Sequence, residues 1–320
     1  MSKKPPIIDF YKQKKKEWWE GADWDSAKEQ HLQNIQGLKN AEDWKARKDR
    51  PITITVVHGS GRHPTKSCAH ELSNSALLLE RGLNLAIEEA DEKPEVWTYN
   101  LREMFLEPCN NCVSTASPLC GFPCTCFVGD DVTTKIYPAV MASDILLMST
   151  PINQAMISSR LKIVLDRLIS LDGGYYNAEL PVKDSSFRQK MITLAEREPV
   201  YDKRMFGKVA AYFVTSKDLN NPHEEEVEIP KPFHRLTYED TVVGALAIQG
   251  SEYGWYHANP YYVVAAADPD VDYSKDKSNY DKQEKAHEEA KKVVEAAISL
   301  AKKHREYPPE LTNPGRINRT

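Results

Sequence analysis

The sequence ITITVVHGSGR, residues 52–62, gives the first indication of the fold. Its first six residues are all β-branched, which favours a short buried strand, and glycine follows at positions 59 and 61. Leucines at helical spacing then predict a helix within residues 70–90. The chain therefore starts a strand, turn and helix unit at about residue 51.

The same alternation continues towards the C-terminus. Further strands are predicted at 95–98, 144–150, 208–215 and 261–266, and further helices at 132–142, 157–171, 238–248 and 279–304. Strands that alternate with helices predict a parallel sheet covered on both faces. Five strands fit an α/β fold with a doubly wound, flavodoxin-like sheet of order 2-1-3-4-5. In such sheets the ligand lies beyond the carboxyl ends of the strands.

Composition restricts the class of protein. Of 320 residues, 41% are hydrophobic and 28% are charged, which excludes a fully disordered chain and supports a sizeable core. The net charge of −5 is too small to argue for nucleic-acid binding. The sequence lacks a run of about 18 apolar residues and starts without the apolar segment of a signal peptide. We therefore expect a cytoplasmic protein with neither a nucleic-acid nor a membrane partner.

The length allows two domains, but one α/β domain with extensions fits the pattern better. We predict an N-terminal arm at 1–50, a flavodoxin-like domain at 51–268, and a C-terminal helix and tail at 269–320. The arm is rich in tryptophan and is expected to pack these side chains on the main body or on a neighbouring subunit. A partly disordered extension is the alternative. The four tryptophans concerned are Trp18, Trp19, Trp24 and Trp44.

The loop after the first strand has the chemistry of an anion site. Ser60 and Arg62 lie in the turn, and Ser73-Asn74-Ser75 opens the next helix. Hydroxyl groups, backbone N–H groups and the helix dipole favour a phosphate there, and Arg62 can add charge-assisted hydrogen bonds. The loop matches neither a Walker A loop nor a GxGxxG pattern. The alternative is that Ser73-Asn74-Ser75 is an ordinary helix cap. The histidines lack metal-binding spacing, and His58 is predicted to be a turn or surface residue.

Residues 150–167, TPINQAMISSRLKIVLDR, carry a more specific pattern. Together with Gly59-Ser60-x-Arg62 and Asn74-Ser75, they resemble the NADPH-dependent FMN reductase family. Family members carry a Thr-Pro segment followed by Ser, Leu-Lys and Asp-Arg after the third strand. The resemblance spans about residues 51–268 and includes Gly207-Lys208 at the fourth strand. Asn153 replaces a common aromatic residue, and Ala155-Met156 replaces the usual Gly-Asn.

This resemblance implies FMN as the cofactor and NAD(P)H as the co-substrate. The phosphate-binding residues it implies are Ser60, Arg62, Ser73, Asn74 and Ser75. The flavin ring would lie against Pro151, Ile152, Asn153, Gln154, Ala155 and Met156. Thr215 and Ser216, in the loop after the fourth strand, would close the other side. Tyr253 and Trp255 either line an outer pocket or simply pack. Hydride chemistry belongs to the cofactor, so we predict no catalytic acid or base.

Five of the six cysteines lie within 18 residues: Cys109, Cys112, Cys120, Cys124 and Cys126. Clustered cysteines in a reducing compartment indicate a metal or redox site more than a disulfide framework. Four thiolates suffice for a [4Fe–4S] cluster or a tetrahedral zinc site. Some relatives of the family, the iron–sulfur flavoproteins, carry a related but more compact cysteine pattern. The spacing here leaves a cluster, zinc, and thiols or a disulfide without metal all open.

Two functional hypotheses follow. The first is an FMN-dependent NAD(P)H oxidoreductase that transfers two electrons to a quinone, a flavin or another small-molecule electron acceptor. The second is an iron–sulfur flavoprotein that acts in electron transfer with a protein partner, with the segment from Cys109 to Cys126 holding a cluster. Family members commonly form homodimers or homotetramers, so the resemblance also implies a homo-oligomer.

Overall fold

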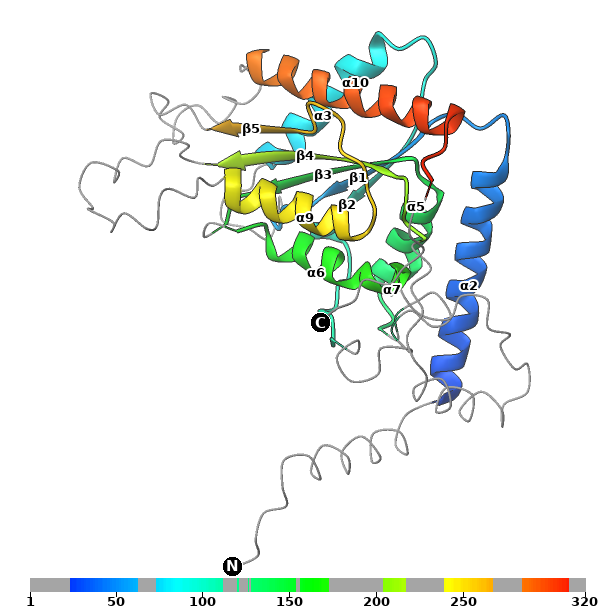
Figure 1. Ribbon diagram of the computed structural model, residues 1–320. Coiled ribbons are helices and arrows are strands. Elements are labelled where there is room, and N and C mark those ends of the chain that lie inside the picture. The colour runs from blue at the N-terminus through cyan, green and yellow to red at the C-terminus, as the bar shows by residue number, and fades with distance from the viewer. Residues whose placement is uncertain are drawn as a thin grey trace, which may run out of the picture.

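The computed structural model describes residues 24–62, 73–111, 120, 126, 128–153, 156–172, 204–216, 239–266 and 284–310. These residues form a five-stranded parallel sheet of order β2-β1-β3-β4-β5 (Figure 1). The strands are β1 (Thr53–His58), β2 (Glu95–Asn100), β3 (Ile145–Pro151), β4 (Val209–Ser216) and β5 (Tyr262–Ala266). The predicted α/β fold and the predicted strand order are confirmed.

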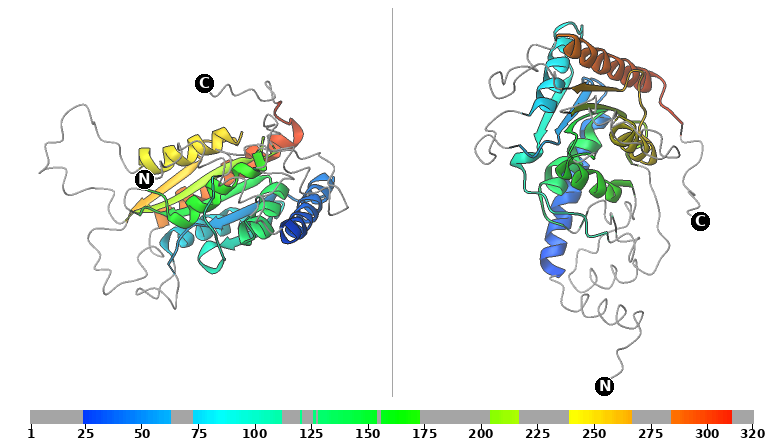
Figure 2. Two further views of the ribbon diagram at one scale, coloured as in Figure 1. Left: turned by 90° about the horizontal axis from the view of Figure 1, so that it is seen from below. Right: turned by 90° about the vertical axis from the view of Figure 1, so that its left-hand side faces the viewer.

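Helices cover both faces of the sheet (Figures 1 and 2). One face carries α3 (Asn74–Glu88) and α10 (Glu284–Glu306), and the other carries α5 (Tyr137–Ala142), α6 (Ser159–Arg167) and α9 (Gly244–Glu252). Shorter elements are η1 (Leu101–Glu103), η3 (Val132–Ile136), α7 (Ile169–Asp172) and η5 (Glu239–Val243). In the described part of the chain, no helix is both long and apolar enough to cross a bilayer.

The central strands are buried on both sides. Every residue of β1 and β4 is buried, whereas β2 lies at the sheet edge and is partly exposed. Ile54 and Val56 of β1 face α3 and α10, while Val57 faces the opposite layer. This continuous apolar pattern is what a parallel sheet covered twice requires. On the first face, α3 and α10 approach closely at Gly82, where a Cβ atom would lie 2.5 Å from the Cβ of Ala290.

Helix α2 (Trp24–Ala46) packs on the amino side of the sheet through α5. The Trp44 ring lies 5.8 Å from the Trp97 ring, and its indole N–H donates to Thr53 Oγ1 at 3.1 Å. This part of the predicted arm therefore contacts the main body. Trp18 and Trp19 lie outside the described residues, as does the side chain of Trp24. The predicted domain boundaries stay predictions.

The helix predicted at 157–171 is interrupted, and α6 and α7 replace it. The carbonyl of Arg167 accepts hydrogen bonds from the Tyr137 hydroxyl at 2.6 Å and from Ser170 Oγ at 3.0 Å. In a continuous helix, this carbonyl would accept a backbone N–H from the next turn. Here it accepts two side-chain hydroxyl groups instead. The helices predicted at 132–142 and 238–248 likewise begin as the π-helical turns η3 and η5.

Candidate functional site

The carboxyl ends of β1, β3 and β4 meet at one edge of the sheet, which faces the viewer in the right-hand view of Figure 2. His58 ends β1 opposite Ser149 of β3, and Pro151 of β3 lies opposite Thr215 of β4. The two loops that the sequence singled out therefore leave the sheet side by side. This edge is where a doubly wound sheet binds its ligand.

Gly59 begins the first loop in a closely packed position. Its N–H donates to the Ser149 carbonyl at 2.7 Å, and its carbonyl accepts from Ser158 Oγ at 2.5 Å. A Cβ atom here would lie 2.8 Å from both the Cβ of Leu161 and the Ser149 carbonyl oxygen. Only glycine fits without a shift of β3 or α6. The start of the loop is therefore held by both neighbouring elements.

The predicted phosphate-binding residues gather where this loop and α3 begin. Ser60 is buried, and its Oγ accepts the Arg62 N–H at 3.3 Å; Arg62 itself is half-buried. Ser73 and Ser75 are also buried, and their hydroxyl oxygens lie 3.0 Å apart. The structure thus describes two buried hydroxyl groups at the N-terminus of α3 and a third, that of Ser60, in the loop that follows β1.

The first turn of α3 keeps its N–H groups available. Ser73 is the N-cap residue, so the run does begin the helix as a cap would, but the Ser73 side chain makes no cap hydrogen bond. Its carbonyl accepts from Leu77, the first N–H of the helix with a partner in the described residues. The N–H groups of residues 74–76, starting at Asn74, therefore have no acceptor among those residues. Available N–H groups beside buried hydroxyls fit a phosphate such as that of FMN.

The loop after β3 is a tight turn. The backbones of Asn153 and Met156 exchange two hydrogen bonds of 2.9 and 3.0 Å, and the Ile152 N–H donates to the Thr215 carbonyl at 2.8 Å. Pro151 has no N–H, and Gln154 and Ala155 lie outside the described residues. The N–H groups of Ile152, Asn153 and Met156 are therefore already paired within the protein and are not available to a flavin ring. Met156 is 51% exposed and offers an apolar surface next to the turn.

The loop after the fourth strand was predicted to contain Thr215 and Ser216, although the predicted strand at 208–215 already included Thr215; the loop placement is wrong. Both residues belong to β4, and both are buried. The strand runs on because its pairing with β3 and β5 extends through these positions. They nevertheless end at the same edge as Pro151, so they stay beside the predicted ring position.

Tyr253 and Trp255 pack, and their outer-pocket interpretation is wrong. The exposed fractions of their side chains are 5% and 4%, and the two ring centroids lie 5.3 Å apart. The Tyr253 hydroxyl donates to the Leu165 carbonyl of α6 at 2.7 Å. Both aromatic residues thus join α9 to the hydrophobic core rather than lining an opening.

His58 is a buried strand residue, so its prediction as a turn or surface residue is also wrong. Its Nδ1 lies 2.9 Å from Ser149 Oγ, and its Nε2 lies 2.8 Å from Glu80 Oε1 of α3. A sequence signal for this placement exists, because His58 continues the every-second-residue pattern of Ile54 and Val56. The imidazole connects β1, β3 and α3 next to the predicted phosphate-binding loop.

Arg167, which belongs to the Asp-Arg motif of residues 150–167, forms a bidentate ion pair with Asp130. Their two nitrogen–oxygen distances are 2.7 and 2.9 Å, and both side chains are fully buried. Burial alone would lower the pKa of Arg167, but the hydrogen bonds to Asp130 hold it above its ordinary value. Asp130 also accepts the N–H of Glu107, and Arg167 donates to the Val128 carbonyl. The pair therefore fastens both ends of the cysteine segment to α6.

Three of the five clustered cysteines are described, namely Cys109, Cys120 and Cys126, and each is partly buried. Burial raises the pKa of the Cys126 thiol; Arg167 opposes this effect, and neighbouring Cys109 adds to it. Among the residues that the structure describes, no three His, Cys, Asp or Glu side chains form a metal-binding group. Cys112 and Cys124 lie outside those residues, so the cluster and zinc alternatives stay predictions.

Comparison with known proteins gives a family and a fold. A family model described as NADPH-dependent FMN reductase matches residues 52–221. No curated protein matches the chain. The solved structure of RosB with bound 8-demethyl-8-formylriboflavin-5'-phosphate has a TM-score of 0.52 and 13% identity, and the match covers 81% of this chain and 82% of RosB. At that identity the likeness shows the fold alone.

Two bacterial structures match with lower TM-scores. An FMN-dependent NADH-azoreductase from Bacillus anthracis str. Ames Ancestor has a TM-score of 0.42 and 13% identity over 76% of this chain and 99% of that one. The Trp repressor binding protein from Bacillus subtilis has a TM-score of 0.39 and 14% identity over 75% and 99%. The family model, by contrast, covers more than half of the sequence, and the chain therefore belongs to the NADPH-dependent FMN reductase family.

Proposed function

We propose that this protein uses FMN and NAD(P)H to transfer two electrons to a small acceptor, such as a quinone or a free flavin. Membership of the reductase family makes it an oxidoreductase, and the proposal adds the class of electron acceptor. The observation that supports the flavin position most directly is the first turn of α3. Its available N–H groups lie beside buried Ser60, Ser73 and Ser75, at the edge where the turn after β3 emerges.

Each part of this edge has a separate task in the proposal. The N–H groups of α3 and the serine hydroxyls bind the flavin phosphate and exclude water from it. Pro151, Ile152 and the exposed Met156 support the ring, which supplies the hydride-accepting chemistry when FMN is bound. Gly59 fixes the position of the first loop relative to the loop after β3, because its backbone is hydrogen-bonded to Ser149 on one side and to Ser158 on the other.

Flavin binding tests the phosphate site. Quenching of flavin fluorescence should show FMN binding at least tenfold more tightly than riboflavin, because only FMN has the phosphate. The variant Ser75→Ala, at a fully buried hydroxyl, should lose most of this difference. Ser251→Ala, at an exposed position of α9, is the matched control and should keep it. Equal binding of FMN and riboflavin by the unaltered protein would exclude the proposed site.

Turnover tests the acceptor. FMN-loaded protein should oxidise NADPH or NADH without oxygen when a benzoquinone or free riboflavin is added, and the product should be the two-electron-reduced acceptor. The measurement is anaerobic stopped-flow absorbance with each acceptor in turn. A protein that reduces its own flavin but neither acceptor would contradict this substrate class while leaving the family assignment intact.

Cysteine placement favours an iron–sulfur flavoprotein as a second candidate. Cys109 and Cys126 come from opposite ends of the segment, yet they are close enough to interact electrostatically, beside Arg167. This candidate requires iron and acid-labile sulfide in protein purified without oxygen, and their loss in Cys126→Ser. Zinc without sulfide would indicate a structural metal instead, and protein without either metal would exclude both metal sites.

The proposed reductase is a cytoplasmic homodimer or homotetramer. Large apolar side chains on the described surface support self-association, since Phe105, Met156 and Ile248 are 61%, 51% and 67% exposed. Light scattering after size-exclusion chromatography should give a mass of two or four chains. A mass of one chain at micromolar concentration would contradict the homo-oligomer.

A further inference from the structure

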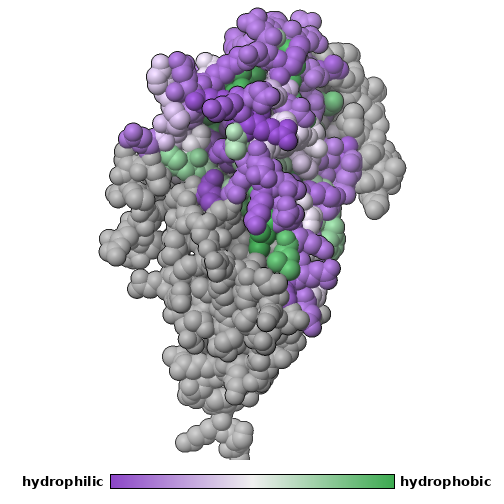
Figure 3. All heavy atoms as spheres, turned by 90° about the vertical axis from the view of Figure 1, so that its right-hand side faces the viewer, coloured by the Kyte–Doolittle hydropathy of each residue, from purple (hydrophilic) through white to green (hydrophobic). Residues whose placement is uncertain are grey.

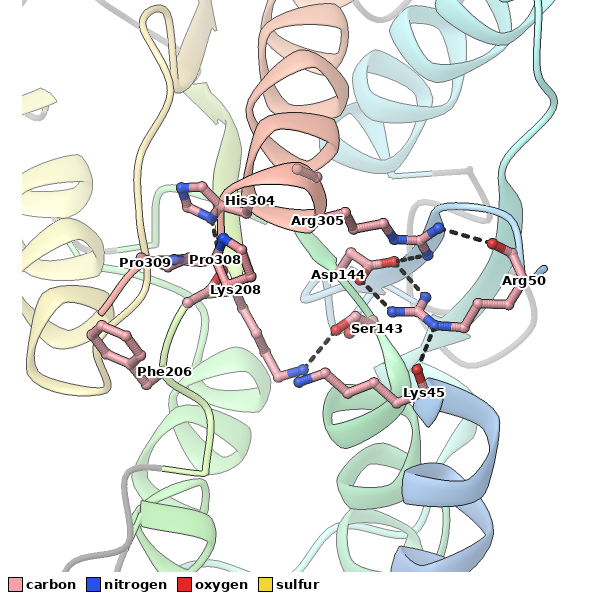
Figure 4. A pocket seen from close by; sticks show the side chains of 12 residues that line it. Lys45, Arg50, Ser143, Asp144, Phe206, Lys208, His304, Arg305, Pro308 and Pro309 are labelled. Atoms are coloured by element: carbon pink, nitrogen blue, oxygen red, sulfur yellow. Dashed lines mark hydrogen bonds and ion pairs between the residues drawn. The ribbon is translucent and has the colours of Figure 1, made fainter. Parts of the chain in front are cut away.

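A pocket lies at the amino edge of the sheet, opposite the predicted flavin site. Its volume is about 400 Å³, within the range of small-molecule sites. Figure 3 views this side of the molecule and shows mostly hydrophilic side chains among the described residues. The pocket is formed where α2, β3, β4 and α10 begin or end (Figure 4). Its polar lining includes Lys45, Arg50, Asp144, Lys208, His304 and Arg305.

The two arginines of this pocket are already paired. Arg50 makes a bidentate contact with Asp144, with two nitrogen–oxygen distances of 2.7 Å, and Arg305 reaches the same carboxylate at 2.7 Å. Arg305 also donates to the carbonyls of Arg50 and Pro51. One carboxylate thus balances one of two guanidinium charges. The lysines of the pocket have no acidic partner of their own among the described residues.

Lys208 is the most enclosed of these cations. Its ammonium Nζ donates to the carbonyls of Met141 and Ser143 at 3.0 and 2.6 Å, at the C-terminal end of α5. A protonated amine has three N–H groups, so one is left over. Figure 4 shows the Lys45 amine pointing towards that of Lys208. In the described part of the chain, no acceptor lies within hydrogen-bond distance of Lys45 Nζ.

The cationic side chains of this pocket outnumber the anionic ones among its lining residues. Burial lowers the pKa of Lys208 well below its usual range, and Lys45 and Arg50 lower it further, while Asp144 opposes them. Desolvation also lowers the pKa of Lys45. Two ammonium groups that converge in this pocket repel each other, and an anion bound between them would offset that repulsion. An oxyanion would accept the left-over N–H of Lys208 and the N–H groups of Lys45.

The other wall of the pocket is apolar. Phe206, Pro308 and Pro309 lie together on the side away from the Arg50–Asp144 contact (Figure 4). Phe206 is held edge-on against Tyr256, with their ring centroids 5.8 Å apart. His304 belongs to the same side, where its Nδ1 donates to the Gly207 carbonyl at 2.9 Å. The pocket therefore has a cationic end and an aromatic, proline-lined end.

We propose that this pocket binds a small molecule with a phosphate group on an aromatic or apolar body, and that Lys45 and Lys208 hold the phosphate. The aromatic body would lie against Phe206 and the two prolines. The site is distinct from the flavin site, because the two lie at opposite edges of the sheet. A phosphorylated effector bound here would contact the ends of α2, β3, β4 and α10 at once.

Isothermal titration with phenyl phosphate tests this proposal. The protein is first saturated with FMN, so that the flavin phosphate site is filled and cannot account for the heat. We expect one phenyl phosphate per chain, whereas phenol should bind at least tenfold more weakly. The variant Lys45→Met should weaken phenyl phosphate binding at least tenfold. Lys48→Met, on an exposed residue outside the pocket lining, is the matched control and should leave binding unchanged.

A second measurement uses the unaltered protein and so does not depend on how the variants fold. Phenyl phosphate should slow acetylation of Lys45 by acetic anhydride several-fold, as read by mass spectrometry, while Lys48 should react at the same rate as before. No protection of Lys45, equal weakening by the two substitutions, or the absence of binding to FMN-loaded protein would each overturn the proposal.

Discussion

Arg167 and Asp130 show how single residues hold the candidate site together. Two charges without solvent contact are costly to bury, and their mutual hydrogen bonds offset that cost only while both partners are present. The Asp130 carboxylate also accepts hydrogen bonds from the N–H groups of Val132 and Thr133 at the start of η3. The pair therefore joins a helix start, the end of α6 and both ends of the cysteine segment.

Removing one partner of this pair should be strongly destabilising. The variant Arg167→Met leaves Asp130 as an uncompensated buried charge, and the free energy of unfolding should fall by about 3–5 kcal/mol. Urea denaturation followed by circular dichroism measures it, with the exposed Lys303→Met as control. The double variant Asp130→Asn, Arg167→Met should lose less than the single one. An unfolding free energy unchanged by Arg167→Met would show that the pair is dispensable.

Gly59 and Gly61 provide a matched pair within one loop. A methyl group at 59 meets the Leu161 Cβ and the Ser149 carbonyl at 2.8 Å, whereas at 61 the nearest atom, in Arg160, is 3.7 Å away. Gly59→Ala should therefore cost about 1–3 kcal/mol through overpacking and weaken FMN binding by shifting the loop. Gly61→Ala should change both quantities little. Thermal unfolding and flavin fluorescence measure the two effects, and equal behaviour of the variants would contradict this view of the loop.

Among the elements, the ends of α2, β1, β3 and α10 are tied together by Asp144. Its carboxylate accepts hydrogen bonds from Arg50 near the end of α2, from Arg305 of α10, and from the Thr53 N–H of β1. Burial alone would raise the pKa of Asp144, but the hydrogen bonds from Arg50, Arg305 and the Thr53 N–H lower it to about 2. The terminal helices are thereby fixed to the amino edge of the sheet.

This lowered pKa predicts a specific dependence of stability on pH. The folded state binds the Asp144 proton more weakly than the unfolded state, whose pKa is near 3.8. Its stabilising contribution is therefore complete above pH 4 and is lost as the pH falls towards 2, by about 2 kcal/mol. Urea denaturation at pH 6, 4, 3 and 2 should show the gap between the unaltered protein and Asp144→Asn shrinking by this amount. A gap that stays constant over this range would contradict the assignment.

At the scale of the whole molecule, the parallel sheet separates two sites. The carboxyl edge carries the loops proposed to bind the flavin, and the amino edge carries the cationic pocket, with the buried strands β1, β3 and β4 between them. Both edges are built from the ends of elements that are far apart in the sequence.

FMN should stabilise this whole unit. A ligand that binds only the folded state raises the free energy of unfolding by about 2.7 kcal/mol at one hundred times its dissociation constant. Removing FMN by dialysis should lower the melting temperature, and adding it back should restore it in a concentration-dependent way. Riboflavin at the same concentration should restore less, since it cannot occupy the N-terminus of α3. Equal melting temperatures with and without FMN would show that the folded protein gains nothing from the flavin.

Much of the fold follows from local sequence. The β-branched run at 52–57 and the amphipathic spacing of leucines predicted β1 and α3, because strand and helix periods are properties of neighbouring residues. The sequence did not predict that the helix at 157–171 is interrupted after Arg167. The cause is tertiary, because the hydroxyl groups of Tyr137 and Ser170 donate hydrogen bonds to the Arg167 carbonyl. Thr215 and Ser216 were misplaced because strand pairing, rather than their own propensity, extends β4.

The sequence by itself determined the alternation of elements, the family resemblance and the hydroxyl-rich loop of the candidate flavin site. Only the tertiary structure decided which polar groups are partners: His58 with Ser149, 91 positions away, Arg50 with Asp144 at 94, and Arg167 with Asp130 at 37. Likewise, Lys45 and Lys208 share a pocket only because α2 ends and β4 begins at the same edge of the sheet. Periodicity is encoded locally, whereas charge pairing depends on distances that exist only after the sheet and its two helical layers have packed.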